Sequence, residues 1–203
     1  MGAGILPTTV HNNKLYFLFG KENKYEDTAP GFGDFGGGEN KNESFMNTAI
    51  REGCEELTGF LGSEKDIKKL LSKYGTYDID CKTTTGSIYR LHLFPLEYDE
   101  KLPYYYNNNQ RFLQKRLYPN VIKKSKIFEK EEIRWICVDD LLKMKKKFRF
   151  FYGPTLEKLS KERESIKSFI INGLFGNKKY NLKNRTRISK SLKNKTRKMR
   201  TLN

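Results

Sequence analysis

Three glutamates lie within five positions of the segment IREGCEELTG, residues 50–59, in a chain whose formal net charge is +16. On a helix, at about 100° per residue, Glu52, Glu55 and Glu56 fall within an arc about 100° wide. Another side of the same helix collects small and apolar residues, namely Met46, Ala49, Ile50, Gly53 and Leu57. The segment therefore predicts a helix with one packed side and one acidic side.

Two interpretations of the acidic side compete. In the first, it is a solvated surface on which Arg51 pairs with Glu55 one turn along. In the second, the carboxylates bind a divalent cation, and oxygen ligands of this kind suit Mg²⁺ or Mn²⁺. Like charges three or four residues apart destabilise a helix by roughly 0.2–0.5 kcal/mol per pair, and Gly53 adds roughly 0.5–1 kcal/mol relative to alanine. A bound cation would offset the repulsion, so the local cost favours a metal site.

A glycine-rich run, GFGDFGGGENKNE, occupies residues 31–43 directly upstream. Gly31, Gly33 and Gly36 spell G-x-G-x-x-G, which is typical of a dinucleotide-binding turn only when a strand comes immediately before it. The preceding residues, KENKYEDTAP, are polar and end at a proline. We therefore reject a dinucleotide site.

The same run has a second spacing when it is counted from Gly37. Five residues separate Gly37 from Glu43, seven more lead to Arg51-Glu52, and two more lead to Glu55-Glu56 and a following glycine. This pattern resembles the Nudix box.

Two positions depart from that box. Gly53 stands where the box has a bulky aliphatic residue, and Leu57-Thr58 place the final glycine, Gly59, one residue late. The first departure concerns helix packing and the second the exit turn, and neither removes a carboxylate.

The resemblance implies an α/β fold, a Nudix-type α/β/α sandwich with a mixed sheet, that hydrolyses a phosphoanhydride bond in a nucleoside diphosphate linked to another moiety. It implies that Glu52, Glu55, Glu56 and the carbonyl of Gly36 ligate Mg²⁺ or Mn²⁺, while one carboxylate accepts a proton from water. Arg51 and Glu43 would hold helix and loop in register, with Gly37 and Gly59 as structural residues. Family members often add a late carboxylate before a strand that bears Trp; in IFEKEEIRW we favour Glu129 over Glu131 and Glu132.

The remaining chain predicts the elements that must position these residues. Strands are expected at 3–10 and 14–20, joined by a turn at 11–13, and at 88–98 and 131–138. Helices are expected at 63–75, 138–147 and 153–173, with a polar, aromatic insertion at 100–120. His11 and His92 are predicted to be structural. The expected domain boundaries are 1–172 for the Nudix hydrolase domain and 173–203 for a basic, disordered tail.

The basic tail accounts for most of the net charge, because residues 177–203 hold eleven Lys or Arg and no acid. Such a segment cannot bury enough apolar surface to fold, and it favours RNA or DNA affinity. A solubility tail or a nuclear-targeting signal are the alternatives. A second basic and aromatic stretch, 110–128, suits single-stranded nucleic acid or is a surface helix with buried aromatics. Its predicted contacts are Arg111, Lys115, Arg116, Lys123 and Lys124.

The substrate hypothesis is capped RNA, since the basic regions make the chain similar to Nudix enzymes that remove mRNA caps. Its composition, rich in lysine, asparagine and tyrosine, is also similar to Nudix proteins of large DNA viruses. Small nucleotides, dinucleoside polyphosphates and inositol pyrophosphates remain alternatives, as does an inactive Nudix fold that binds RNA. Three cysteines without a C-x-x-C pair predict a reducing, intracellular and most simply cytoplasmic setting, and we expect no membrane partner because no apolar run could span a bilayer.

Overall fold

The computed structural model describes residues 1–26, 28–83, 85–125 and 129–174. Its centre is a seven-stranded mixed sheet in which β1 runs parallel to β6 and the other pairs are antiparallel. The strands are β1 (Gly2–His11), β2 (Lys14–Glu22), β3 (Phe32–Gly33), β4 (Phe35–Gly38), β5 (Tyr77–Lys82), β6 (Ile88–Pro95) and β7 (Lys130–Cys137).

Strands β1 and β2 pair only near their hairpin and then separate. Asn12 and Asn13 form the turn with φ of 48° and 60°, a left-handed conformation that asparagine tolerates well. Beyond the paired residues, β4 adds to β1 and β3 adds to β2. The short segment from β3 to β4 therefore lines the opening between two diverging strands.

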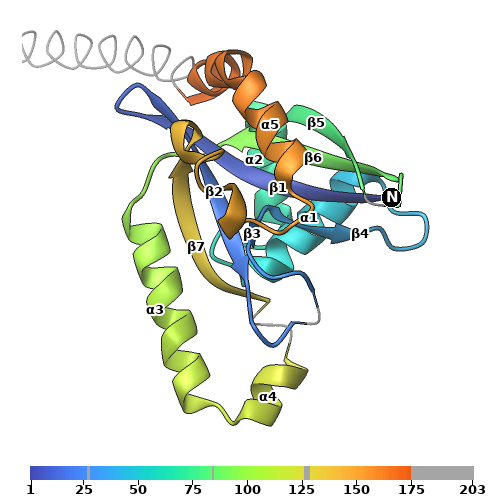
Figure 1. Cartoon of the computed structure of the whole chain (residues 1–203), viewed down its shortest axis with the longest axis vertical. Helices are drawn as coiled ribbons and strands as arrows, with labels where there is room; N and C mark the ends of the chain where they lie inside the picture. Colours follow the sequence, from blue (N-terminus) through green and yellow to red (C-terminus); the bar gives the residue numbers. More distant parts are fainter. Residues whose placement is uncertain (27, 84, 126–128, 175–203) are drawn as a thin grey trace, which may run out of the picture.

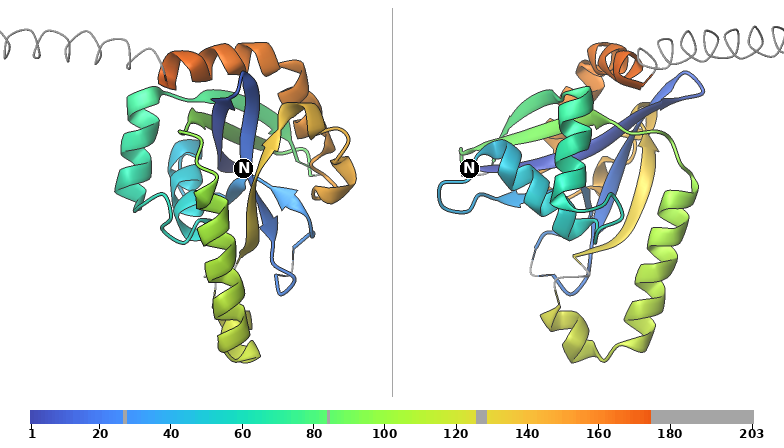
Figure 2. Two further views of the ribbon diagram at one scale, coloured as in Figure 1. Left: turned by 90° about the vertical axis from the view of Figure 1, so that its left-hand side faces the viewer. Right: turned by 180° about the vertical axis from the view of Figure 1, so that it is seen from behind.

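Helices cover both faces of the sheet (Figures 1 and 2). Two hydrophobic clusters, one on each face, contain residues that alternate along a strand, as when Ile5 and Leu6 enter opposite clusters. This arrangement confirms the α/β/α expectation. The helices are α1 (Phe45–Glu56), α2 (Glu64–Tyr74), α3 (Lys101–Arg116), α4 (Pro119–Lys124), α5 (Gly153–Lys161) and the helical residues 163–174.

Helix α1 begins where the sequence has a capping residue and packs unusually close to β1. The Ser44 side chain accepts a hydrogen bond from the backbone N–H of Asn47 at 3.2 Å. A Cβ at Gly53 would lie 2.3 Å from Cδ1 of Ile5. The Ile5 side chain thus fills the space that an aliphatic residue at position 53 would occupy, which explains the first departure from the box.

Several predicted elements need correction. The insertion at 100–120 contains the 16-residue helix α3, and the glycine-rich run forms strands β3 and β4. Residues 138–147 do not form one helix: η2 (Val138–Asp140) and η3 (Lys145–Lys147) are short 3₁₀ turns, because the chain bends back so that Phe148 can bridge to Phe32. Strand β5 was not predicted.

The folded body extends slightly further than the predicted boundary at 172. The terminal helix breaks at Glu162 and then continues through residue 174, and the side chain of Leu174 lies in the hydrophobic core. The predicted tail from residue 175 onward lies outside the described residues.

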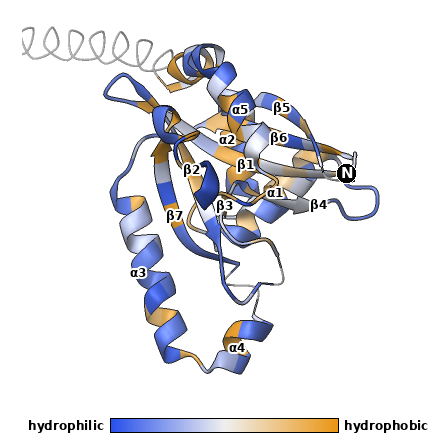
Figure 3. Ribbon diagram, in the orientation of Figure 1, coloured by the Kyte–Doolittle hydropathy of each residue, from blue (hydrophilic) through white to orange (hydrophobic). Residues whose placement is uncertain are grey.

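Hydropathy follows the layers, with apolar residues in the sheet and mostly polar residues along α3 and α4 (Figure 3). No helix in the described ranges combines the length and apolarity needed to cross a bilayer. Cys54, Cys81 and Cys137 are free thiols.

Candidate active site

A pocket of about 370 Å³ opens between the diverging strands. Its walls come from β2 and the segment after it, the β3–β4 segment, α1, β5, β6, the residue before β7, and residues before and within α5. Six carboxylates line it: Glu22, Glu26, Asp34, Glu52, Glu56 and Glu129. Cationic and aromatic groups complete the lining, among them Lys82, Arg149, Tyr89, Phe151 and Tyr152.

Arg51 and Glu43 connect the loop before α1 to the helix. Arg51 donates from Nε to Oε1 of Glu43 and from Nη2 to Oε2, each at 3.0 Å, and Nη2 also reaches the Gly38 carbonyl at 3.0 Å. Glu43 accepts further hydrogen bonds from Asn40 N–H and the Thr48 hydroxyl. The Arg51 guanidinium, followed by the Asn40 N–H, lowers the pKa of Glu43 to about 2. These contacts join α1 to the loop before it.

Glu52 lies on α1 and lines the pocket. A Cβ at Gly37 would lie 2.6 Å from Cδ and Oε1 of Glu52, so glycine at this position lets the carboxylate lie directly against β4. Arg51 Nη1 contacts Glu52 Oε1 at 2.7 Å and Glu55 Oε2 at 3.4 Å. Glu55 is about half exposed and lies outside the pocket lining.

Glu56 is buried at the floor of the pocket beside Lys130, whose side chain is also fully buried. Glu56 Oε2 accepts the Gly36 N–H at 2.8 Å, and its Oε1 lies 2.9 Å from Lys130 Nζ. Lys130 pairs in addition with Glu22, which Arg149 Nη1 contacts at 3.1 Å. Two cations, Lys130 and Arg149, are therefore shared between two buried acids, Glu22 and Glu56.

Burial raises the pKa of Glu56 to about 8, an effect that Lys130 opposes and the charges of Glu22 and Asp34 reinforce. Burial also raises the pKa of Asp34, which accepts a 2.6 Å hydrogen bond from the Tyr89 hydroxyl. Burial disfavours charge on Lys130, but Glu56 and Glu22 outweigh it and raise its pKa. Lys130 therefore stays charged, while burial favours the protonated form of Glu56.

The donor atoms of this pocket suit a divalent cation, although the side chains are not arranged around one. Among the described residues, no three acidic, histidine or cysteine side chains converge as a metal-binding group. The pocket nevertheless holds an excess of carboxylates over cations. Burial raises the pKa of Glu56 and of Asp34, so added positive charge in the pocket would stabilise their ionised forms. Oxygen donors of this type fit Mg²⁺ or Mn²⁺.

Of the three late glutamates, Glu129 is the one that lines the pocket. Glu131 pairs with Lys21 at 2.5 Å, and Glu132 pairs with Arg134. Gly59 takes φ of +77° directly after Thr58 at +48°, so two left-handed residues accommodate the extra position at the exit of α1.

Sequence reasoning missed five buried or partly buried residues of this site, namely Glu22, Asp34, Tyr89, Lys130 and Arg149. Asp34 carried a usable signal, because an acid between glycines and phenylalanines in GFGDFGG is unusual in a surface loop. The predicted nucleic-acid contacts lie elsewhere, on α3 and α4, where their side chains are exposed; they are Arg111, Lys115, Arg116, Lys123 and Lys124.

No family model matches the chain, and no curated protein matches it. Among solved structures, the chain is similar to an Ap4A hydrolase from C. elegans with a TM-score of 0.49 and 15% identity, over 81% of this chain and 99% of that one. It is similar to the Nudix hydrolase RenU from M. smegmatis with a TM-score of 0.46 and 12% identity, over 82% and 87%. It is similar to the MutT protein from Methanosarcina mazei Go1 with a TM-score of 0.43 and 16% identity, over 80% of this chain and 93% of that one. Likenesses of this size assign neither a family nor an activity.

Proposed function

We propose that this chain is a Nudix-type hydrolase that cleaves phosphoanhydride bonds with the help of Mg²⁺ or Mn²⁺. The observation that carries the proposal is the placement of Glu52 and Glu56 in one pocket with Gly36, Gly37 and Glu129, while the Arg51–Glu43 contacts fix α1 to the preceding loop.

In this proposal Glu52, Glu55, Glu56 and the Gly36 carbonyl are the metal ligands, and Glu55, which contacts Arg51 outside the pocket lining, would have to turn toward the metal. The bound metal would polarise the bridging pyrophosphate and acidify a water molecule. Glu129 lines the same pocket and is the candidate proton acceptor. Lys82 and Arg149 line the same pocket and supply positive charge for the phosphates of the substrate.

The proposed substrate is a nucleoside diphosphate linked to a larger polyanion, with capped RNA as the leading candidate. The support is electrostatic, since exposed cations outside the pocket and the basic residues 177–203 would attract a polynucleotide. Small nucleotides, dinucleoside polyphosphates and inositol pyrophosphates are the alternative substrates.

The test is product analysis across these four substrate classes with Mg²⁺ or Mn²⁺. The wild-type chain should release two phosphorylated products, and Glu52→Gln and Glu56→Gln should each reduce kcat by about 100-fold or more, because even outer-shell changes at metal sites cost 10–100-fold. Glu132→Gln removes a glutamate that pairs with Arg134 outside the pocket and should retain activity.

Full activity in both pocket variants would refute the proposal. Absence of hydrolysis in the wild-type chain for every substrate class, with RNA binding intact, would instead support the inactive RNA-binding fold. Release of methylated guanosine diphosphate from capped RNA identifies decapping, whereas turnover of free nucleotides alone excludes it.

A further inference from the structure

We propose that residues 101–125, which contain α3 and α4 and are called the arm below, bind a single-stranded polynucleotide and guide its end to the pocket. The binding surface stands on the arm's own chemistry. Only delivery to the pocket rests on the proposed function.

The arm is a cationic surface without counter-charges of its own. It contains six Lys or Arg and no Asp or Glu, and all six cations are exposed. Across the described residues, none of the six has a carboxylate within 4.0 Å, whereas on α2 Lys69 lies 3.8 Å from Asp66. These charges are available to phosphates.

Aromatic side chains stand exposed among these cations. Tyr104, Tyr105 and Phe112 on α3 are 64%, 59% and 58% exposed, and Tyr118 before α4 is 81% exposed. Of the arm's aromatic residues, only Tyr106 is buried. The aromatic residues therefore do not serve as the buried side of a surface helix, which was the alternative interpretation of this stretch.

On α3 the two kinds of side chain share one face. At about 100° per residue, Tyr104, Asn108, Arg111, Phe112 and Lys115 fall within an arc about 100° wide, which extends for about 16 Å along the axis. The Arg116 guanidinium lies 5.8 Å from the Phe112 ring beside this stripe. Rings between cations suit bases that stack and phosphates that pair. A membrane-surface helix separates its apolar and cationic residues onto different faces.

The arm is fixed to the sheet next to the pocket. The Asn107 side chain donates to the Ile133 carbonyl at 3.1 Å and accepts its N–H at 2.8 Å. The Tyr106 hydroxyl donates a hydrogen bond and lies 3.0 Å from the Glu56 carbonyl and 3.2 Å from the Lys130 carbonyl. The arm is thus anchored to the backbone of two residues at the pocket floor.

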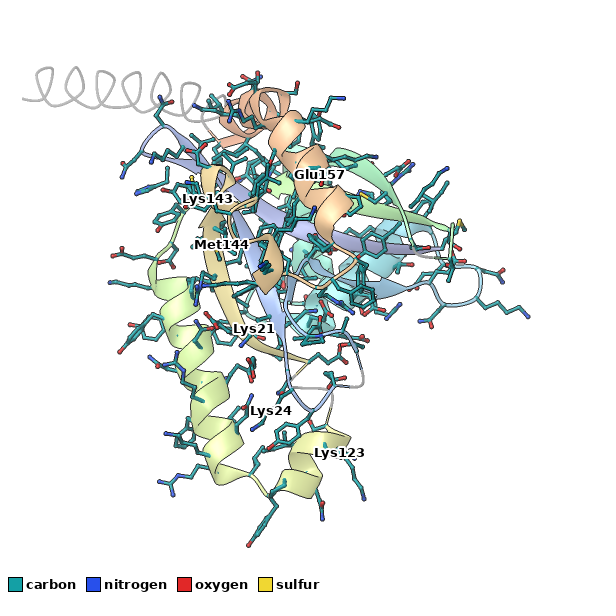
Figure 4. The ribbon with its side chains drawn as sticks, viewed as in Figure 1. Lys21, Lys24, Lys123, Lys143, Met144 and Glu157 are labelled. Atoms are coloured by element: carbon teal, nitrogen blue, oxygen red, sulfur yellow. The ribbon has the colours of Figure 1, made fainter. Side chains whose placement is uncertain are left out.

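The far end of the arm lies at the same end of the molecule as a segment that contributes residues to the pocket. Helix α4 lies at the same end of the molecule as the segment between β2 and β3, as both views show (Figures 1 and 2). Lys123 on α4 and Lys24 in that segment are labelled in Figure 4. Glu26 and Thr28 of the segment, and Glu129 before β7, line the pocket. A strand bound along the arm would have its end close to these residues.

Fluorescence anisotropy of the full chain with a labelled 12-nucleotide single-stranded RNA tests the surface. Tyr104→Ala/Phe112→Ala should weaken binding by at least about tenfold, since one base–aromatic stack contributes about 1–3 kcal/mol. Arg111→Gln/Lys115→Gln should also weaken it and reduce the salt slope of log K by about 1.4. The matched control, Lys65→Gln/Lys69→Gln on α2, removes the same charge and should bind almost as tightly as wild type.

Equal binding by wild type and both arm variants overturns the proposal, as does equal weakening in the α2 control. Tighter binding to a blunt RNA duplex than to the single strand also overturns it, because stacking requires unpaired bases. So does competition by polyglutamate as effective as that by unlabelled single-stranded RNA, because polyglutamate has no bases. A single-stranded DNA of the same sequence distinguishes the two polynucleotides. Binding to vesicles of phosphatidylcholine and phosphatidylserine should be the same for wild type and the arm variants. If the arm variants weaken binding to vesicles but not to RNA, the proposal is contradicted.

A hydrolysis assay separates this inference from the proposed function. Arm variants should retain turnover of a small phosphoanhydride substrate. If the wild-type chain hydrolyses no substrate but the arm variants still lose RNA affinity, the proposed activity fails and the binding surface stands. If arm variants lose RNA affinity but not hydrolysis of an RNA end, delivery to the pocket is refuted.

Discussion

At the scale of single residues, buried ionisable groups cluster around Lys130. Its ammonium group contacts Glu22 and Glu56, both almost completely buried. Removing one partner from such a cluster costs about 3–5 kcal/mol, because the remaining charges stay buried. Lys130 therefore stabilises the floor of the pocket and holds Glu56 in a fixed position before any ligand binds.

The Glu43–Arg51 pair predicts a pH dependence of stability. The pKa of Glu43 in the folded protein is about 2, below its ordinary value of 4.5, so the folded state binds this proton less readily than the unfolded chain. Its stabilising effect is complete above about pH 4.5 and is lost as the pH falls toward 2. In urea denaturation between pH 6 and 3, Glu43→Gln should show a smaller loss of unfolding free energy than wild type.

Glu157→Gln is the control for this experiment. Glu157, labelled in Figure 4, pairs with Lys145 on the surface, and both side chains are more than half exposed. A pair of this kind contributes little to stability. The unfolding free energy of this variant should change with pH as that of the wild type does. If the unfolding free energy of Glu43→Gln falls with pH as steeply as that of the wild type, the Glu43–Arg51 pair does not make stability depend on protonation of Glu43.

At the scale of elements, the close contact of α1 with β1 depends on Gly53 and Ile5. Glycine is normally unfavourable inside a helix, yet here a methyl group at position 53 would overlap the Ile5 side chain. The helix can therefore lie directly on the strand, which places Glu52 and Glu56 at the pocket wall.

A double-mutant cycle tests this contact. Gly53→Ala should destabilise the protein by about 1–3 kcal/mol through overpacking, despite the better helix propensity of alanine. In an Ile5→Ala background, where Cγ1 and Cδ1 are absent, the same change should be neutral or stabilising. Urea denaturation gives the four free energies, and additive effects would show that the two residues are not coupled.

The sequence was sufficient for elements specified by local pattern and insufficient for those held by distant contacts. The spacing of Glu52, Glu55 and Glu56 predicted α1 because its signal lies within one helix. A helix was only an alternative interpretation of residues 110–128, and none was predicted for the first half of α3. Its tyrosines and asparagines are weak helix formers, and Asn107 and Tyr106 hold it through contacts with β7 and α1. Lys130 was missed because an isolated lysine before two glutamates gives no sign of burial.

At the scale of the whole molecule, opposite charges are separated. Acids gather in the pocket, while cations gather on the arm and in residues 177–203. A field of this kind draws a polyanion to the surface. Under the proposed function, only its phosphoanhydride end would need to enter the pocket.

Deletion of residues 177–203 tests the contribution of the basic tail. The truncated chain should bind single-stranded RNA more weakly and with a smaller salt slope, since eleven cations are removed. Its turnover of a small substrate and its thermal unfolding midpoint should be unchanged, because the core through Leu174 is retained. Loss of folding on truncation would mean that the tail belongs to the structural body.

The Asn107 amide has a consequence for self-association. An edge strand with vacant N–H and C=O groups is a template on which a second chain can extend the sheet, and this is a common route to aggregation. At Ile133 both groups are already taken by a side chain that imitates a neighbouring strand. Strand addition along β7 is thereby blocked at its middle, so copies of the protein would have to meet through another surface.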